Sequence, residues 1–202
     1  ESFELAKSMV DIGTGMNRDT IGIVTDMDEP LGFAVGNSLE VIEAIETLKG
    51  NGPKDLLELA LTLGSNMLIL ANKVENFEEG KKLLLENIKN GKALEKLKEF
   101  VKAQGGNPAC VDNTDLLPKA KYIIEVKANK SGTISKIHAE EMGLTAMELG
   151  AGRATKESVI DLAVGIVLCK KRGEKVSEGD ILARIYANDE NKGHKAVEKI
   201  LR

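Results

Sequence analysis

The chain is organised around the stretch Asp26-Met27-Asp28-Glu29-Pro30-Leu31-Gly32-Phe33-Ala34-Val35-Gly36-Asn37-Ser38-Leu39-Glu40-Val41-Ile42-Glu43. A short, β-branched apolar run, Ile21-Gly22-Ile23-Val24, precedes it and predicts a buried strand from Arg18 to Met27. Asn37 is a good helix N-cap, and the carboxylate of Glu40, three residues later, can reach back to it. This order of strand, irregular loop and helix would turn backbone carbonyls towards a carboxylate. A hard cation needs such an oxygen-rich environment.

The composition predicts a soluble globular protein with one large domain or two modest ones. The chain has 202 residues, of which 42% are hydrophobic, and this is enough to build cores. Its net charge of -4 comes from interspersed acids and bases, and aromatic residues make up 3%. Nucleic acid and membrane are therefore not expected as partners, because the sequence offers neither a basic patch nor a stacking platform.

The most apolar segment, from Leu56 to Ala71, predicts a core helix, since it is too short and too polar to span a bilayer. No basic and apolar leader precedes it, so export is not expected. Cys110 and Cys169 lack metal-type spacing, and free thiols in a cytoplasmic protein are favoured over a single disulfide. The chain opens at Glu1 without a Met, and its first helix has no cap of its own. We expect truncation of a longer protein, with a cloning or processing boundary as the alternative.

Helical periodicity dominates the first half and predicts helices over 3–10, 38–48, 53–73, 76–90 and 92–103. The helix over 53–73 is apolar on nearly every side and is expected to be the most buried element, with another backbone crossing close to Gly64. Asn76 and Glu79 form a capping pair. No period is present from Gln104 to Pro118, so we predict two domains, 1–117 and 118–202.

The period changes to two after Lys119. Alternation from Tyr122 to Ala128 predicts a half-buried strand, and a turn at 129–132 predicts a hairpin with a strand over 133–137. We then expect helical segments over 140–149 and 157–164, strands at 166–169, 176 and 181–186, and a peripheral helix over 192–202. The predicted fold is α/β: part of a mixed sheet flanked by helices, followed by a small α+β domain. The β portion of that domain resembles half of the hammerhead sandwich of biotinyl and lipoyl carrier domains.

Other motifs indicate little chemistry. Gly13-Thr14-Gly15 precedes a predicted strand, whereas a phosphate loop follows one, so a structural turn is favoured. His138 and His194 lie far apart and near no clustered acids or cysteines, which favours structural or surface histidines. No spacing selects a pair of carboxylates for glycoside chemistry, and we assign none.

Two sets of residues resemble a known enzyme family. The first comprises Met9-Val10-Asp11-Ile12-Gly13, Thr25-Asp26-Met27, Pro30-Leu31-Gly32, Val35-Gly36-Asn37 and Glu40-Val41, and the second comprises Glu148-Leu149-Gly150-Ala151-Gly152-Arg153 and Gly173-Glu174-Lys175-Val176. They are similar to the second half of pyrimidine-nucleoside phosphorylases, the family that includes thymidine phosphorylase. The resemblance covers nearly the whole chain and implies that the family's first half is absent.

This resemblance implies a parent enzyme that catalyses reversible phosphorolysis of uridine, thymidine or deoxyuridine to a pentose 1-phosphate and a free pyrimidine. The parent would be a cytoplasmic homodimer that binds phosphate and a pyrimidine nucleoside. The family's phosphate loop and pyrimidine-contacting residues would lie in the absent N-terminal half. We therefore assign no catalytic or substrate-binding residue on this chain and expect it to be inactive alone.

The resemblance also implies one cofactor, a monovalent cation that is usually potassium, and no organic cofactor. The ligands on this chain would be the backbone carbonyls of Leu31 and Ala34 and the carboxylate of Glu43, with further ligands from the absent half. The residues alone would favour a solvated glutamate at Glu43.

The loop Gly150-Ala151-Gly152-Arg153 is a candidate for closing the active-site cleft over substrate. Gly150 and Gly152 permit backbone angles that other residues avoid, and Arg153 offers a charged fork for a group on the absent domain. The alternative is a helix C-cap followed by a surface arginine.

Two other functions stay open at this point. One is a related phosphorylase that acts on nucleoside monophosphates. The other is a non-catalytic carrier or binding module, because of the hammerhead-like end. A carrier would need a lysine at a β-turn within Met-Lys-Met or Asp-Lys-Ala, and neither tripeptide occurs.

Overall fold

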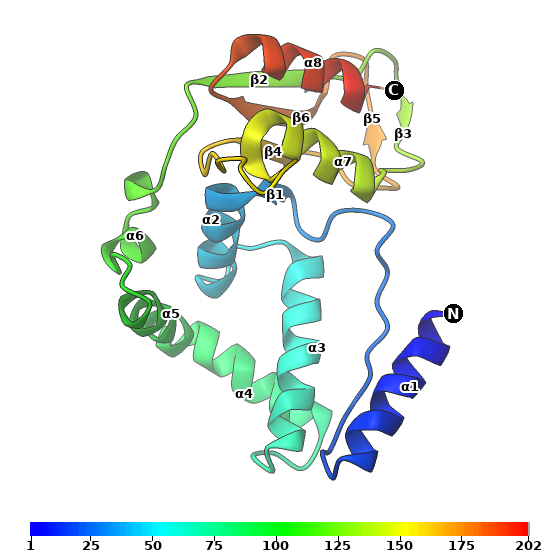
Figure 1. Ribbon diagram of the computed structural model, residues 1–202, viewed down its shortest axis with the longest axis vertical. Coiled ribbons are helices and arrows are strands. Elements are labelled where there is room, and N and C mark those ends of the chain that lie inside the picture. The colour runs from blue at the N-terminus through cyan, green and yellow to red at the C-terminus, as the bar shows by residue number, and fades with distance from the viewer. Residues whose placement is uncertain (202) are drawn as a thin grey trace.

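The computed structural model describes residues 1–201 and has an antiparallel sheet at one end and a group of helices at the other (Figure 1). The architecture is mixed α/β, which confirms the predicted fold class. Cys110 and Cys169 are both free thiols, as expected. Within the described residues, no helix is both long and apolar enough to cross a membrane.

The helices are α1 (Ser2–Gly15), α2 (Asn37–Leu48), α3 (Lys54–Leu70), α4 (Phe77–Lys89), α5 (Lys92–Ala103), α6 (Ala109–Asp112), the 3-10 helix η1 (Thr114–Leu116), α7 (Ala139–Ala146), the π-helical turn η2 (Met147–Ala151) and α8 (Glu190–Ile200). The strands are β1 (Ala34–Gly36), β2 (Tyr122–Lys127), β3 (Gly132–Thr133), β4 (Gly165–Leu168), β5 (Lys175–Val176) and β6 (Ile181–Ala187).

The main sheet has the strand order β1-β4-β6-β2, and each of its pairs is antiparallel. Ile124 and Ile166 lie on either side of Ile185 in the register, so apolar side chains of neighbouring strands face the same side. Ile166 and Ile185 are completely buried. The core of this part of the molecule therefore lies on one face of the sheet, beneath α7 and α8 (Figure 1).

The C-terminal helix α8 is an integral part of this core. It packs against β2 and β6, and its residues Gly193 and Ala196 are buried. A Cβ on Gly193 would lie 2.5 Å from Cδ1 of Ile124, so the helix approaches β2 at this glycine. The prediction that this helix is peripheral is wrong, because its apolar stripe covers one end of the sheet.

β2 does not form the predicted hairpin with the segment that follows it. It pairs with β6, and Gly132–Thr133 of β3 pairs with β5 in a separate two-stranded sheet. The pairing with β6 places Val126 opposite Ala183, and both side chains are buried. Both residues of β3 are exposed, so burial favours the distant partner over the local turn.

The predicted strand from Arg18 to Met27 is also absent, and this segment is irregular. Ile21 and Val24 are 42% and 39% exposed. A strand needs a neighbour for its backbone groups, and no strand among residues 1–201 pairs with this segment. Gly22 lies against α1 instead, next to Val10.

The start of α2 differs in detail from the prediction. The N-cap is Gly36, whose N–H donates to Oε1 of Glu40 at 2.9 Å. The expected hydrogen bond between the Glu40 carboxylate and the N-cap N–H therefore forms, but to the residue before Asn37. The side chain of Asn37 does not cap the helix, since its Nδ2 donates to the carbonyl of Ala151 at 2.8 Å. Asn37 therefore links α2 to the segment that follows α7.

The helices α3 and α4 pack closely, although α3 is not the most buried element. Of its residues, Leu61 and Ser65 are buried, and Met67 is 68% exposed. The two helix backbones approach closely at Ser65 of α3, next to the predicted Gly64. A Cβ on Gly80 of α4 would lie 3.0 Å from Cα of Ser65, whereas Gly64 faces a leucine side chain. The predicted capping pair of α4 is confirmed, because the Asn76 side chain accepts the N–H of residue 79 at 3.0 Å.

β1 joins the helical part of the molecule to the C-terminal sheet. Its residue Ala34 lies opposite Val167 of β4. A Cβ on Gly165 would lie 2.4 Å from the carbonyl oxygen of Val35, so this close approach requires glycine. The main sheet therefore contains residues from both predicted domains, and the division between 1–117 and 118–202 stays a prediction.

Candidate functional site

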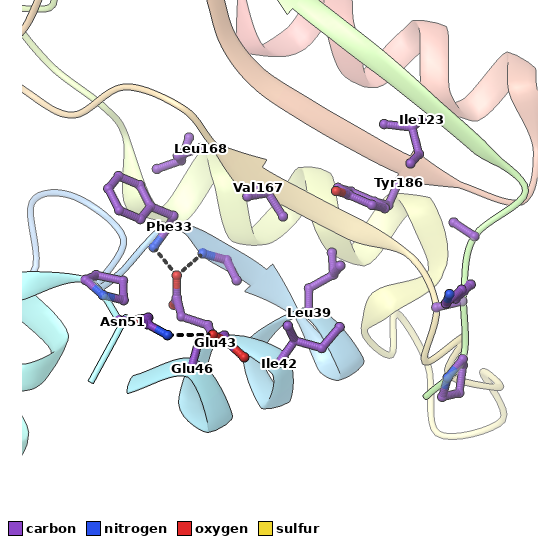
Figure 2. A pocket seen from close by; sticks show the side chains of 17 residues that line it. Phe33, Leu39, Ile42, Glu43, Glu46, Asn51, Ile123, Val167, Leu168 and Tyr186 are labelled. Carbon is purple, nitrogen blue, oxygen red and sulfur yellow. Dashed lines mark hydrogen bonds between the residues drawn. The ribbon is translucent and has the colours of Figure 1, made fainter. Parts of the chain in front are cut away.

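The carboxylate of Glu43 is enclosed by the loop from Pro30 to Ala34. Its Oε1 accepts hydrogen bonds from the backbone N–H of Phe33 at 2.8 Å and of Ala34 at 3.2 Å (Figure 2). A Cβ on Gly32, whose φ is +67°, would lie 2.2 Å from Oε2. The other carboxylate oxygen therefore lies directly against the loop backbone, at a position where only glycine leaves room for it.

Two further charged side chains hold the same loop. Asp55, in the first turn of α3, accepts the N–H of Gly32 at 3.0 Å and pairs with Lys171 at 3.0 Å. Lys171 follows β4 and donates to the carbonyl of Pro30. Its ammonium also lies 5.6 Å from the centre of the Phe33 ring. The loop is thus fixed by side chains from three separate elements of the fold.

The environment of these groups shifts their pKa values in opposite directions. Burial raises the pKa of Glu43 and outweighs the backbone N–H groups of Phe33 and Ala34, which lower it. The charge of Asp55 raises that pKa further, and Lys171 lowers it. Burial also acts on Asp55, but the hydrogen bond from Lys171 and two backbone N–H groups outweigh it and lower the pKa. A cation beside Glu43 would favour the charged form of its carboxylate and so offset the free-energy cost of burying that charge.

The expected ligands Leu31, Ala34 and Glu43 lie together around this loop. Leu168 donates its N–H to the carbonyl of Phe33, so Phe33 and Leu168 form a hydrogen-bonded pair of the antiparallel ladder. Such pairs alternate with pairs that are not hydrogen-bonded to each other, and the next pair is Ala34 and Val167. The backbone N–H and carbonyl of Ala34 therefore point away from β4. The N–H of Ala34 reaches Glu43, and its carbonyl faces the same side. No hydrogen bond found among residues 1–201 ends on the carbonyl of Leu31.

This set of donors fits a hard monovalent cation, because it contains two free carbonyls and a carboxylate and is built from oxygen alone. Within the described part of the chain, no three His, Cys, Asp or Glu side chains gather in a way that could hold a metal ion. The assignment of the three ligands stays a prediction.

Glu43 also stands at one end of a cavity of about 640 Å³ between α2 and the main sheet (Figure 2). Beside it, Glu46 accepts a hydrogen bond from the Asn51 side chain at 3.4 Å. The walls are mostly apolar and include side chains of α2, β2, β4 and β6. The residues labelled in Figure 2 include Leu39, Ile42, Ile123, Val167, Leu168 and Tyr186. The cavity is therefore polar at the end where Glu43 and Glu46 lie and mostly apolar along the rest of its walls.

Sequence reasoning missed Asp55, Lys171 and this cavity. Asp55 has the pattern of an ordinary first-turn acid of a helix, and Lys171 belongs to the basic turn Lys170-Lys171-Arg172. The chain brings Lys171 to a loop 141 residues away, and no local pattern indicates this contact.

The segment Gly150-Ala151-Gly152-Arg153 is less free than expected. Its first glycine has a φ of +118° inside η2, and the carbonyl of that residue accepts the N–H of Asp161 at 2.9 Å. The Ala151 carbonyl is bound by Asn37. The helical stretch expected over 157–164 does not form. Arg153 is exposed, and closure of a cleft by Gly152 and Arg153 stays a prediction.

Comparison with known proteins agrees with this architecture. Residues 1–94 match the glycosyl transferase family a/b domain, and residues 133–202 match the pyrimidine nucleoside phosphorylase C-terminal domain. The chain is 56% identical over 191 residues to the pyrimidine-nucleoside phosphorylase of Bacillus subtilis (strain 168), and this match covers 95% of the chain and 44% of the relative. It is 55% identical over 184 residues to that of Staphylococcus aureus (strain USA300), covering 91% of the chain and 42% of the relative.

The chain thus spans less than half the length of the curated relatives it matches. The first matched region contains α1 to α4 and β1, and the second contains α7, β4, β5, β6 and α8, while β2 lies in the segment between them. With this level of identity over nearly its whole length, the chain belongs to the pyrimidine-nucleoside phosphorylase family.

Proposed function

We propose that this chain is the C-terminal portion of a pyrimidine-nucleoside phosphorylase. The complete enzyme would catalyse the reversible phosphorolysis of uridine, thymidine or deoxyuridine to a pentose 1-phosphate and a free pyrimidine. The observation that carries this proposal is the 56% identity over 95% of the chain to a relative of that name.

The chemistry explains why the portion alone would be inactive. Phosphate must attack the anomeric carbon while the pyrimidine leaves, so the site has to bind an anion and stabilise the charge that develops on the base. We assign no residue of this chain to either task. Phosphate, the nucleoside and the groups that bind them would meet in the complete enzyme.

Exposed apolar side chains support a larger assembly. Phe3 and Met9 of α1 and Met16 directly after it are 78%, 62% and 72% exposed, and Met27 is 78% exposed. Gathered on one helix and the segment after it, such side chains are typical of surfaces that other protein covers. We propose that the remainder of the enzyme covers them, in a cytoplasmic homodimer.

We further propose that the carbonyls of Leu31 and Ala34 and the carboxylate of Glu43 hold a monovalent cation, K⁺, with ligands from elsewhere in the complete enzyme. The ion would supply a fixed positive charge that ties the loop to α2. The orientation of the Ala34 carbonyl and the half-buried carboxylate support this assignment.

The test is an assay of uracil release from uridine and phosphate. We expect activity from the complete protein that contains this sequence and none from the 202-residue chain alone, since residues that act as a unit leave no partial rate when one group is removed. Uracil release by the chain alone that persists through further purification would contradict the assignment of the sites. Inactivity of the complete protein on every pyrimidine nucleoside would contradict the proposed function itself.

A further inference from the structure

Three charged side chains bind backbone groups of the loop from Pro30 to Ala34. The two carboxylates, Glu43 and Asp55, accept backbone N–H groups, and the ammonium of Lys171 donates to a carbonyl. Each charge thus has a polar partner on the loop, and Asp55 and Lys171 are also paired with each other. The carbonyls that remain without such a partner include those of Leu31 and Ala34.

The formal charges of these groups do not cancel. Two carboxylates and one ammonium leave a single net negative charge around the loop. The side chain of Lys171 is only 13% exposed, so solvent screens its charge weakly. One monovalent cation would bring the cluster to neutrality, whereas a divalent cation would leave an excess positive charge.

Other charged groups nearby bond to one another instead of to the loop backbone. Glu46 pairs with Lys49 at 3.0 Å on the far side of Glu43. Arg172 pairs with Asp26 and Asp28, whose side chains are 59% and 72% exposed. The backbone N–H of Arg172 also donates to Glu29 at 3.2 Å. Of these charged groups, Glu43, Asp55 and Lys171 are the ones that bond directly to the backbone of the loop from Pro30 to Ala34.

We propose that Lys171 and Asp55 set the charge of the cation site, so that it selects a monovalent ion over a divalent ion of similar size. This inference rests on the proposed cation site and adds two residues that do not touch the ion. Lys171 acts as a positioning and specificity-determining residue through its charge and through its hold on Pro30.

The expected size of the effect follows from Coulomb's law. A unit charge at roughly 6 Å, in an effective dielectric constant of about 20, changes the affinity for a monovalent cation about a hundredfold and that for a divalent cation by the square of this factor. Partial exposure of Asp55 reduces both effects. Removing the ammonium should therefore shift the preference towards the divalent ion by at least about tenfold.

The experiment measures the melting temperature of the complete protein against concentration of KCl or BaCl₂. Ba²⁺ has nearly the radius of K⁺ and twice its charge, so it separates charge from size. N-methyl-D-glucamine chloride keeps the ionic strength constant. The apparent dissociation constants of the two ions give a ratio for each variant, and this ratio needs no measurement of activity.

We expect Lys171→Met to move the ratio at least about tenfold towards Ba²⁺ and Lys171→Arg to keep it near the wild-type value. Lys170→Met is the matched control, because it removes the same charge from the same turn. The ammonium of Lys170 lies 3.9 Å from the carboxylate of Glu174 and makes no hydrogen bond to the loop. The double variant Lys171→Met/Asp55→Asn restores one net negative charge and should restore the preference for K⁺. Asp55→Asn alone leaves the three groups with no net charge, so it should move the ratio at least about tenfold towards K⁺, and it tests the inference if an unpaired Asp55 keeps Lys171→Met from folding.

Two results would overturn the inference in different ways. If the wild-type protein responds to K⁺ and the ratio is unchanged in Lys171→Met, or is shifted equally by Lys170→Met, the charge of Lys171 does not set selectivity and the cation site still stands. If neither ion stabilises the wild-type protein, the cation site itself is wrong, and this inference falls with it.

Discussion

Replacing Gly32 by alanine tests the contact between the loop and Glu43 most directly. Gly32 has a φ of +67°, in the left-handed region, and a Cβ there would lie 2.2 Å from Oε2 and 2.9 Å from Cδ of Glu43. These distances are far below any real contact, so the carboxylate must move. Movement separates Oε1 from the backbone N–H groups of Phe33 and Ala34.

The expected loss of stability has two parts. Left-handed backbone strain costs about 1–2 kcal/mol for a residue with a Cβ. Hydrogen bonds to a charged group contribute about 1.5–3 kcal/mol each, and halving the sum of the two bonds for the partial exposure of Glu43 leaves roughly 1.5–3 kcal/mol for the pair. Gly32→Ala should therefore destabilise by about 2.5–5 kcal/mol. Gly91→Ala is a matched control, because its φ is +79° and no atom lies within 4 Å of the added Cβ, so it should cost about 1–2 kcal/mol.

Urea unfolding of the complete protein, followed by circular dichroism, gives both free energies of unfolding. The same substitution in a Glu43→Ala background completes a double-mutant cycle, in which the extra cost of Gly32→Ala should vanish. If Gly32→Ala and Gly91→Ala cost the same within about 0.5 kcal/mol, the carboxylate does not pack against the loop and the site described above is wrong.

Three further substitutions test other parts of the molecule. Glu43→Gln in the complete protein should weaken the rise in melting temperature that K⁺ produces, since it removes the formal charge from the ligand set; a rise equal to that of the wild type would contradict the ligand assignment. Gly193→Ala should destabilise by about 1–3 kcal/mol despite its better helix propensity, and Ile124→Val, which removes the clashing Cδ1, should relieve this in urea unfolding; a more stable Gly193→Ala would contradict the close packing of α8. Arg153→Ala should lower kcat/KM of the complete enzyme with stability within about 0.5 kcal/mol, and unchanged kinetics would leave only the helix-cap interpretation.

Elements with a strong local signal could be predicted from the sequence. The capping pair Asn76 and Glu79 forms as expected, because both partners lie within one helical turn. The helices α2 to α5 follow from periodicity, and the strands β4 and β6 follow from short apolar runs bounded by turn residues. In each of these cases, the residues that indicate the element lie within it or directly beside it.

Strand pairing could not be predicted in the same way. The turn after β2 favours a local hairpin, but pairing with β6 buries Val126 opposite Ala183, and that gain is visible only once the sheet is assembled. The run Ile21-Gly22-Ile23-Val24 has strand-like residues, yet it pairs with no strand among residues 1–201 and is irregular. Propensity indicates what a segment can form, and its neighbours decide what it does form.

The loop from Pro30 to Ala34 shows the same limit at the candidate site. The loop has no N–H at Pro30 and a positive φ at Gly32, so it continues the ladder that β1 forms with β4 only as far as the carbonyl of Phe33. Its peptide groups need partners from outside, and they receive them from α2, α3 and the turn after β4.

The sequence pattern contains the loop and Glu43, which lie within one short stretch. The partners Asp55 and Lys171 are 23 and 141 residues from the loop atoms that they bind, so only the fold could reveal them. Because Lys171 comes from the sheet side and Asp55 from the helical side, the shape of the loop depends on both parts of the molecule being in place. A change that shifts the C-terminal sheet should therefore alter the proposed cation binding even when Leu31, Ala34 and Glu43 are intact.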